Sequence, residues 1–414
     1  MSYRTAIIGG GAAGFFSAIE LKSVMPDMYV KIFERGRKVL SKVEISGGGR
    51  CNCTNSFAEV KSLSQVYPRG DKLLKRLFKI FGPRDVFEWF ESHGVPLFTQ
   101  DDNCVFPQAQ DSHVIIDCFM REAETRGVRI EVSHKVRGIE RVTKVGDFHG
   151  GSDAFLIDGE EFDFVIMTTG GMSDGASSFF RDMLGESIID PIPSLFTFSI
   201  NDARLHHLMG LVVENVLTSV PGTKFKSEGP LLITHWGVSG PAILRLSSYA
   251  ARYLSERDYR AGLSVNWTGE RNTENVRDYL SSVISENRSK MLSSYRPYNI
   301  QLRLWDYLRL KLGKRCRWDE LGNKDVNRLT ELLTNDIYQI DGKGTFKEEF
   351  VTCGGVALDA VNPNTMECKS VSGLFFAGEV LDIDGVTGGF NFQAAWTTAY
   401  VCAHGVLGKV NKGQ

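Results

Sequence analysis

A glycine-rich turn near the start of the chain, Gly9–Gly14 (GGGAAG), constrains the fold more than any other feature. A short apolar run at residues 3–8 precedes it, and residues 14–24 follow with apolar side chains at helical spacing. Residues 29–33 then alternate as a second strand. Strand, helix and strand within this length form the minimal unit of a parallel sheet. The pattern predicts a Rossmann-like α/β fold.

Each position of the G-x-G-x-x-G turn has a physical role in holding a dinucleotide. Gly9 permits the tight bend, Gly11 lets a pyrophosphate approach the backbone, and Gly14 lets the helix pack on the strand. Ala13 belongs to the same turn, at the start of the helix, where free N–H groups and the positive dipole end attract phosphate. A helix start without a ligand is the alternative for such a turn taken alone.

Glu34 closes the second strand, where a carboxylate accepts hydrogen bonds from ribose hydroxyls. An acid at this position repels a 2′-phosphate, so the turn favours FAD or NAD over NADP as the bound dinucleotide.

Three further glycine clusters distinguish FAD from NAD. They are Ser46–Asn55 (SGGGRCNCTN), Thr168–Gly171 (TTGG) and Gly373–Asn391 (GLFFAGEVLDIDGVTGGFN). In the first, Gly48 and Gly49 permit close approach to a flat ring or a phosphate, and Arg50 supplies a cation. Asn55 supplies an amide suited to a ring edge, and a solvated loop is the alternative reading of the cluster.

The other two clusters come after predicted strands. Thr169 and Gly170 follow an apolar strand at residues 162–167, at the end of a parallel strand where ligand crevices form. In the C-terminal cluster, Glu379 or Asp382 is expected to bind ribityl hydroxyls. Gly378 precedes them, and a helix start at Gly389–Asn391 is expected to face the flavin C2 carbonyl. Because NAD has no ribityl chain, clusters from both ends of the chain favour FAD.

The composition is that of an ordinary globular protein. The chain has 414 residues, which implies two or three domains, and a net charge of −2, which favours neither nucleic acid nor an anionic membrane. No apolar run approaches the roughly 20 residues of a membrane span. The eight cysteines are scattered without zinc-ligand spacing, and no signal peptide is visible, so we expect reduced thiols, no metal site and a cytoplasmic protein.

Proline-punctuated β-rich runs begin near Pro191, polar helical sequence follows, and the glycine-rich style returns after Gly344. We therefore expect a discontinuous FAD-binding domain at residues 1–190 and 345–414, an inserted β-rich domain at 191–270 and 336–344, and a helical subdomain at 271–335.

Together these clusters resemble the bacterial flavoprotein family known as the YhiN or BaiN type, often labelled aminoacetone-oxidase-like. The resemblance spans the chain and is carried by five segments: Gly9–Gly14, Ser46–Asn55, Leu232–Leu244, Thr352–Leu358 and Gly373–Trp396. It implies a discontinuous FAD domain, an inserted β-barrel-like domain and a small helical domain. The FAD contacts it implies are Gly9, Gly11, Gly14, Glu34, Arg35, Lys42, Gly48, Gly49, Arg50, Asn55, Gly378, Asp382, Gly389 and Asn391, with Val136 as a backbone contact to adenine. One departure is the segment Met172–Phe180, which is shorter than in the family.

No catalytic residue is identified beyond two candidates. Cys51, two residues before Cys53, is a candidate redox thiol, although a disulfide across one residue is strained and a small residue lining the flavin is the alternative. His235 is a candidate proton donor, with a structural histidine as the alternative.

These features predict an FAD-dependent oxidoreductase that transfers a hydride between flavin N5 and a small or medium organic substrate. NAD(P)H is a candidate reductant, which would dock without a Rossmann fold of its own because the chain has no second G-x-G-x-x-G. The basic stretch Arg303–Arg317 leaves an RNA-associated flavoprotein as an alternative, although a solvated helix face is the simpler interpretation and nucleic acid is not the expected partner. A non-catalytic FAD-binding module is the third hypothesis.

Overall fold

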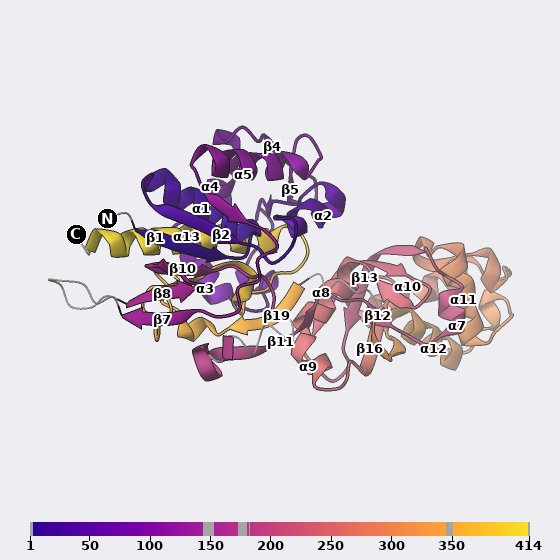
Figure 1. Ribbon diagram of the computed structural model, residues 1–414. Coiled ribbons are helices and arrows are strands. Elements are labelled where there is room, and N and C mark those ends of the chain that lie inside the picture. The colour runs from indigo at the N-terminus through magenta and orange to yellow at the C-terminus, as the bar shows by residue number, and fades with distance from the viewer. Residues whose placement is uncertain (1–2, 144–152, 173–179, 182, 345–350, 413–414) are drawn as a thin grey trace. The chain divides into compact units, whose positions relative to one another are not determined.

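The computed structural model describes residues 3–143, 153–172, 180–181, 183–344 and 351–412 (Figure 1). The chain forms two compact units. Unit 1 comprises Met1–Ile192 and Val351–Gln414, and unit 2 comprises Pro193–Phe350. Unit 1 is therefore assembled from both ends of the sequence.

A five-stranded parallel sheet is the centre of unit 1. Its strands, in spatial order, are β20 (Leu374–Phe376), β10 (Phe164–Met167), β1 (Arg4–Ile8), β2 (Tyr29–Phe33) and β6 (Arg129–Glu131). Every residue of β10 and β20 is buried, as expected for parallel strands with both faces covered.

The order of the strands places a topological switch point at the carboxyl end of β1. The chain leaves β1 through helix α1 (Ala12–Val24) and returns as β2 on one side of β1, whereas β10 pairs with β1 on the other side. At such a switch point the connections after the two central strands diverge and leave room for a ligand. The turn at Gly9 and the segment at Thr168 both begin at this edge.

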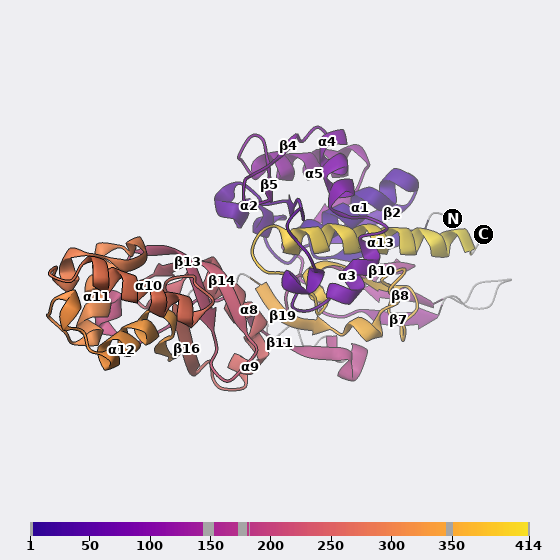
Figure 2. The same cartoon turned by 180° about the vertical axis from the view of Figure 1, so that it is seen from behind.

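The long C-terminal helix α13 (Phe390–Lys412) packs along α1 and returns the end of the chain to the core of unit 1 (Figure 2). The Ser17 hydroxyl of α1 donates to the carbonyl of Ala399 in α13 over 3.3 Å. Trp396 is fully buried and packs against Phe16 and Phe90. This helix is therefore part of the domain core and not an appendage.

Apolar side chains recur at helical spacing over residues 71–90, but these residues do not form one helix. It is divided into α3 (Asp71–Leu77) and α4 (Pro83–Ser92). Gly82 is extended, with φ −108°, and Pro83 occupies the first turn of α4, where its missing N–H costs nothing. The apolar side chains keep helical spacing across this break, but Pro83 fixes the start of α4.

The remaining elements of unit 1 form smaller layers. They are α2 (Ser41–Gly49), β3 (Thr54–Asn55), β4 (Leu97–Thr99), β5 (Cys104–Pro107), α5 (His113–Thr125), β7 (Glu140–Thr143), β8 (Asp153–Ile157), β9 (Glu160–Phe162), β11 (Ile188–Ser194, which runs to the edge of unit 2) and β19 (Val351–Val356). Strands β3, β5 and β4 form one sheet, β7, β8 and β9 a second, and β11 and β19 a third.

Unit 2 contains a separate sheet with antiparallel pairing. Its spatial order is β17 (Asp336–Ile340), β16 (Ala261–Asn266), β13 (Val212–Ser219), β14 (Lys226–Ile233), β15 (Gly237–Ser239), β12 (Phe198–Ser199) and β18 (Gly342–Lys343). The two edge strands, β17 and β18, are separated by Asp341 alone, so the sheet must curl until its edges meet. Within the described residues no ladder joins those edges, so the expected barrel-like sheet is strongly curled but not a hydrogen-bonded closed barrel.

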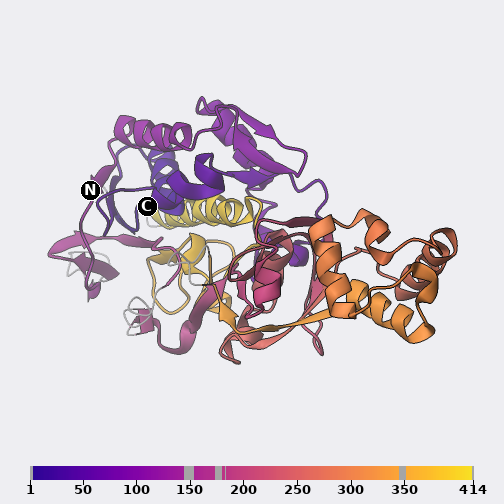
Figure 3. The ribbon, with the colours of Figure 1, turned by 90° about the vertical axis from the view of Figure 1, so that its right-hand side faces the viewer.

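Helices complete unit 2: α7 (Ala203–His206), α8 (Pro241–Tyr249), α9 (Ala251–Ser255), α10 (Thr273–Glu286), α11 (Leu302–Leu312) and α12 (Asn323–Thr334). Figure 3 shows the last three gathered in one group, drawn in orange. One buried cluster runs from Phe198 of the sheet to Trp305 of α11, whose ring stacks on Trp318 at 6.1 Å. The predicted α/β class is confirmed, while a separate subdomain at residues 271–335 stays a prediction.

Candidate functional site

The turn after β1 has the three glycine environments that a phosphate cradle requires. Gly9 has φ 116°, and a Cβ there would lie 2.3 Å from the carbonyl oxygen of Thr168. A Cβ at Gly14 would lie 2.1 Å from the carbonyl oxygen of Gly9, which requires glycine for close packing of helix and strand. A Cβ at Gly11, in contrast, would meet no atom within 4 Å. The space above Gly11 is thus open in the protein itself.

The N-terminus of α1 points its backbone donors toward that space. Gly11 is the N-cap residue, no side chain caps the helix, and its first turn carries no acid. The first N–H groups of a helix lack partners within the helix and form an anion site. Ala13 lies in this first turn and is buried.

Glu34 stands at the end of β2 beside the same turn. Its carboxylate accepts hydrogen bonds from the backbone N–H groups of Gly10, at 2.9 Å, and Gly36, at 2.6 Å. Each carboxylate oxygen has further acceptor capacity, so ribose hydroxyls can still be bound. Arg35, the next residue, is exposed and free to reach a phosphate.

The segment after β6 runs beside Glu34. The backbone N–H of His134 donates to the carbonyl of Glu34 over 2.9 Å, and Val136 follows two residues later, half-buried. The adenine contact at Val136 stays a prediction. The His134 ring bridges Asp158 and Glu131, and its hydrogen bond to Asp158 raises the pKa of the imidazole, although partial burial opposes the shift.

The second glycine cluster forms a tight, non-helical kink at the end of α2. Gly47, Gly48 and Gly49 have φ of 57°, 69° and 83°, the left-handed region that favours glycine. A Cβ at Gly48 or Gly49 would meet nothing within 4 Å, so this backbone also borders open space.

The Arg50 side chain has other partners. Its guanidinium lies over the ring of Phe106, 4.3 Å from the centroid, and it donates to Gln110 and to the carbonyl of Gly47. A flavin contact for Arg50 thus stays a prediction. It would use the guanidinium N–H groups that these two hydrogen bonds do not occupy.

The C-terminal cluster lies against both N-terminal clusters. A Cβ at Gly378 would lie 2.9 Å from the Cβ of Ala13, and a Cβ at Gly389 would lie 2.1 Å from the carbonyl oxygen of Thr54. The Asn55 side-chain amide donates to the carbonyl of Gly388 over 3.0 Å. The structure therefore brings the three glycine clusters together, although more than 300 residues separate the first from the last.

Glu379 connects two other predicted contacts. Its carboxylate pairs with Lys42 at 2.5 Å and accepts the Thr352 N–H at 3.0 Å. A Cβ at Gly170 would lie 3.8 Å from the same carboxylate, so Thr169 and Gly170 lie in this neighbourhood. The short segment after them, residues 173–179, is outside the described residues.

Two predicted contacts of the C-terminal cluster hold the loop together. The Asn391 side chain accepts the N–H of Gly385 at 2.8 Å and donates to its carbonyl at 2.9 Å. The backbone N–H of Asp382 donates to the carbonyl of Val356. Asn391 thus shapes the loop that precedes α13, and a direct flavin contact by its amide stays a prediction.

An ion pair that sequence reasoning missed supports this loop. The guanidinium of Arg69 forms two hydrogen bonds to the carboxylate of Asp384, which is fully buried. Burial works against the charge of Arg69, but Asp384 outweighs it and raises the pKa of Arg69. No sequence signal pairs residues 315 positions apart.

The candidate catalytic residues lie in different surroundings. Cys51 and Cys53 are fully buried free thiols, and Cys51 has φ 59°. Burial raises the pKa of Cys53 well above its usual value, so this thiol stays protonated. His235 belongs to unit 2, where its exposed ring meets Trp236 edge-on at 4.3 Å.

The arrangement fits an extended dinucleotide. Open space borders Gly11, Gly48 and Gly49, uncapped N–H groups point from α1, and Glu34 remains able to accept ribose hydroxyls. Over the described part of the chain, no group of three or more His, Cys, Asp or Glu side chains could hold a metal ion. None of the described helices combines the length and apolar character needed to cross a membrane.

Comparisons with known proteins agree with this geometry. A family model described as the HI0933-like protein Rossmann domain matches residues 3–405. The ribosomal RNA dihydrouridine synthase of Escherichia coli (strain K12) is 28% identical over 98% of each chain. The 3-dehydro-bile acid delta(4,6)-reductase of Clostridium scindens is 25% identical, over 96% of this chain and 97% of the relative.

One solved structure supports the fold. The 3-ketosteroid delta1-dehydrogenase of Sterolibacterium denitrificans superimposes with a TM-score of 0.52 at 9% identity, covering 99% of this chain and 100% of that one.

Proposed function

This chain belongs to the HI0933-like family of Rossmann-domain proteins and is an FAD-dependent oxidoreductase, and on that premise we propose that it reduces a carbon–carbon double bond conjugated to a carbonyl group. We further propose that the double bond is the C5=C6 bond of uracil in ribosomal RNA.

The reaction type rests on the full-length relatives. Formation of dihydrouridine, as the name of the E. coli relative states, adds two hydrogens to an alkene conjugated to a carbonyl. A delta(4,6)-reductase acting on a 3-dehydro-bile acid adds hydrogen to alkenes conjugated to a ketone. The substrates differ, but both reactions require hydride delivery to the carbon distant from the carbonyl. This shared chemistry is the observation that carries the proposal.

The residues of unit 1 hold and orient the cofactor. The first turn of α1 presents N–H groups to the pyrophosphate above Gly11, and Glu34 accepts hydroxyls of the adenosine ribose. The glycine backbone at Gly48 and Gly49 leaves space for the ring system. Bound FAD supplies hydride chemistry, and the protein contributes position and electrostatics.

Around the ring, the C-terminal segment supplies polar groups. Glu379 and Asp382 are the candidates for the ribityl hydroxyls, and the start of α13 after Gly389 offers unpaired N–H groups to a carbonyl edge. Lys42 keeps the charge of Glu379 paired. NAD(P)H is the proposed reductant, docking without a second dinucleotide-binding turn.

Uracil in RNA is favoured over a small enone because two relatives, from E. coli and Haemophilus influenzae, share that description at 28% identity over at least 96% of this chain. This revises the expectation that the partner is a small molecule alone. A small cyclic enone is the second candidate, supported by the bile acid reductase.

The test uses purified full-length protein. We expect absorption near roughly 450 nm from bound oxidised flavin, and bleaching under anaerobic conditions on addition of NADPH or NADH. The reduced protein is then mixed with ribosomal RNA that lacks dihydrouridine, or with a 3-keto-4-ene steroid. Nucleoside mass spectrometry should detect a gain of two hydrogen atoms on uridine.

Reoxidation by the steroid with unchanged RNA would replace uracil by the small enone as the substrate. Reoxidation by neither substrate would contradict the proposed reaction type.

A further inference from the structure

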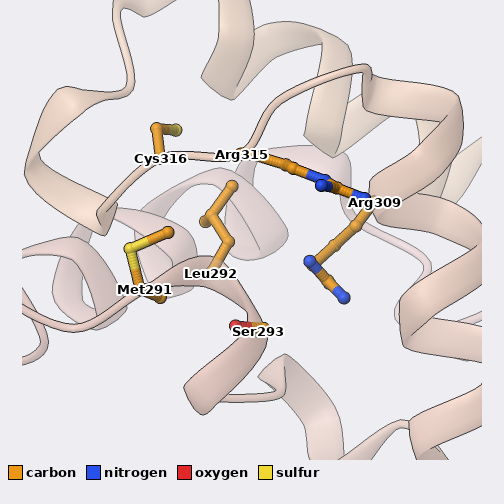
Figure 4. Close-up of a pocket in the computed structure, with 6 residues that line it drawn as sticks. All are labelled: Met291, Leu292, Ser293, Arg309, Arg315 and Cys316. Atoms are coloured by element: carbon orange, nitrogen blue, oxygen red, sulfur yellow. The ribbon is translucent and has the colours of Figure 1, made fainter.

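A basic cavity lies in unit 2, among the helices α10 to α12. Its volume is about 260 Å³, and it is lined by Met291, Leu292, Ser293, Arg309, Arg315 and Cys316. Figure 4 shows Arg309 and Arg315 along one side of it, with Met291, Leu292 and Ser293 opposite. The lining thus contains two guanidinium groups and a hydroxyl but no carboxylate.

Backbone pairing fixes the two walls relative to each other. The N–H of Leu292 donates to the carbonyl of Cys316 over 3.0 Å, and Met291 pairs with Arg317 in an antiparallel bridge. The N–H of Trp318 donates to the carbonyl of Lys290. In this antiparallel register exposed Arg315 lies opposite Ser293, whereas Arg288 lies farther along, where its carbonyl accepts the N–H of Asp319 over 3.2 Å.

Several of these charges are not neutralised by neighbouring acids. Asp306 holds one nitrogen of Arg309, but the Arg309 Nε is buried without a hydrogen-bond partner in the described structure. The side chains of Arg288 and Arg315 have no ion pair or hydrogen bond to any described residue. The nearby Lys314, in contrast, pairs with Asp325 at 3.2 Å.

The volume of the cavity indicates the size of the ligand that it can hold. Pockets that enclose an organic cofactor or a drug-sized ligand measure about 300–1,000 Å³. A cavity of about 260 Å³ with two guanidinium groups fits a single phosphate and its sugar instead. Guanidinium groups bind phosphate oxygens through paired, charge-assisted hydrogen bonds.

We propose that this cavity binds a backbone phosphate of the RNA substrate, with Arg309 and Arg315 as its phosphate contacts; the inference rests on the proposed function. The net charge of the chain is −2, so RNA attraction must come from such a local cluster and not from the whole protein. The basic stretch 303–317 then contributes part of the RNA-binding site and is not only a solvated helix face.

The test is fluorescence anisotropy of a labelled, uridine-containing RNA hairpin with the full-length FAD-loaded protein. The variant is Arg315→Ala, which leaves the Arg309–Asp306 pair intact. The control is Arg260→Ala, another exposed arginine of unit 2. We expect Arg315→Ala to lose about tenfold in affinity. The slope of log K against log salt should decrease by about 0.7, the contribution of one single-strand phosphate contact.

Equal RNA affinity of Arg315→Ala and the control would overturn the proposal. Competition by polyglutamate as effective as that by unlabelled RNA would also overturn it, because the cavity would then bind acidic chains in general. FAD content and NADPH oxidation are measured on the same proteins. If Arg315→Ala reduces uracil as well as the unmodified protein does, the cavity is not the RNA site, but the proposed function still holds. If RNA binding depends on Arg315 but uracil is not reduced, the cavity binds RNA and the proposed function is wrong.

Discussion

Gly378 and Ala13 approach so closely that a Cβ on Gly378 would lie 2.9 Å from the Cβ of Ala13. One residue follows the strand β20 near the end of the chain, and the other lies in the first turn of α1. The contact joins the two halves of the dinucleotide cradle. It leaves no room for a side chain on Gly378, which also has φ 78°.

The first prediction concerns this contact. Gly378→Ala should weaken FAD binding at least about tenfold, or about 1.4 kcal/mol, because the methyl group pushes β20 and α1 apart. Adding Ala13→Gly should restore part of the affinity by removing the clash, though not the strain of the positive φ. FAD titration of the apoproteins measures both effects. Additive losses in the double variant would show that the two residues are not coupled.

The open space above Gly11 gives a sharper test of cofactor binding. Gly11→Ala adds a methyl group that meets no protein atom within 4 Å, so the fold should survive while the pyrophosphate is obstructed. We expect a normal melting temperature for the apoprotein and FAD affinity reduced by about tenfold or more.

Two alanine variants serve as controls for Gly11. Gly408→Ala, in α13 and also without a neighbour within 4 Å, should keep the cofactor. Gly14→Ala should destabilise the protein itself, because its Cβ would lie 2.1 Å from the carbonyl oxygen of Gly9. Retention of FAD by Gly11→Ala would contradict the position of the pyrophosphate.

The buried pair of Arg69 and Asp384 should be costly to break. Arg69→Met removes the guanidinium from the fully buried carboxylate of Asp384 and should lower the free energy of unfolding by about 3–5 kcal/mol. Asp384→Leu combined with Arg69→Met should recover most of that loss, since the buried carboxylate is then removed as well. Urea unfolding of the two variants measures the difference. A double variant as unstable as the single one would indicate that the loop, and not the charge, requires this pair.

Stability should depend on pH through His134. The hydrogen bond that the His134 ring donates to Asp158, with a further contribution from Glu131, raises the pKa of His134. A raised folded-state pKa gives stability that is fully present below the ordinary value of about 6.5 and is lost as the pH rises through the folded-state pKa. His134→Gln should therefore cost more stability at about pH 5.5 than at about pH 8.5. Urea unfolding across this range measures it, with the exposed His207→Gln as control; a cost independent of pH would contradict the ion pairs.

Local features of the site could be predicted from residue types. The sequence assigns Gly9 to a tight bend, Gly14 to close packing of helix on strand, and Gly11 to the approach of a pyrophosphate. In the structure a Cβ at Gly9 or Gly14 would clash with backbone, whereas a Cβ at Gly11 would meet no atom within 4 Å. A glycine turn between a strand and a helix constrains its own backbone, so this information is local. The partners of Arg50 could not be predicted, because Phe106 and Gln110 are far from it in the sequence and contact it only through tertiary packing.

By itself, the amino-acid sequence determined the parallel α/β architecture, the dinucleotide turn and the acid at Glu34. These follow from backbone conformation and short-range periodicity, which act over a few residues. Only the tertiary structure decided that Gly378 meets Ala13, that Arg69 pairs with Asp384, and that Met291 pairs with Arg317. Contacts between residues distant in sequence depend on how whole strands and helices pack. The buried core determines that packing, and the contacting residues themselves do not.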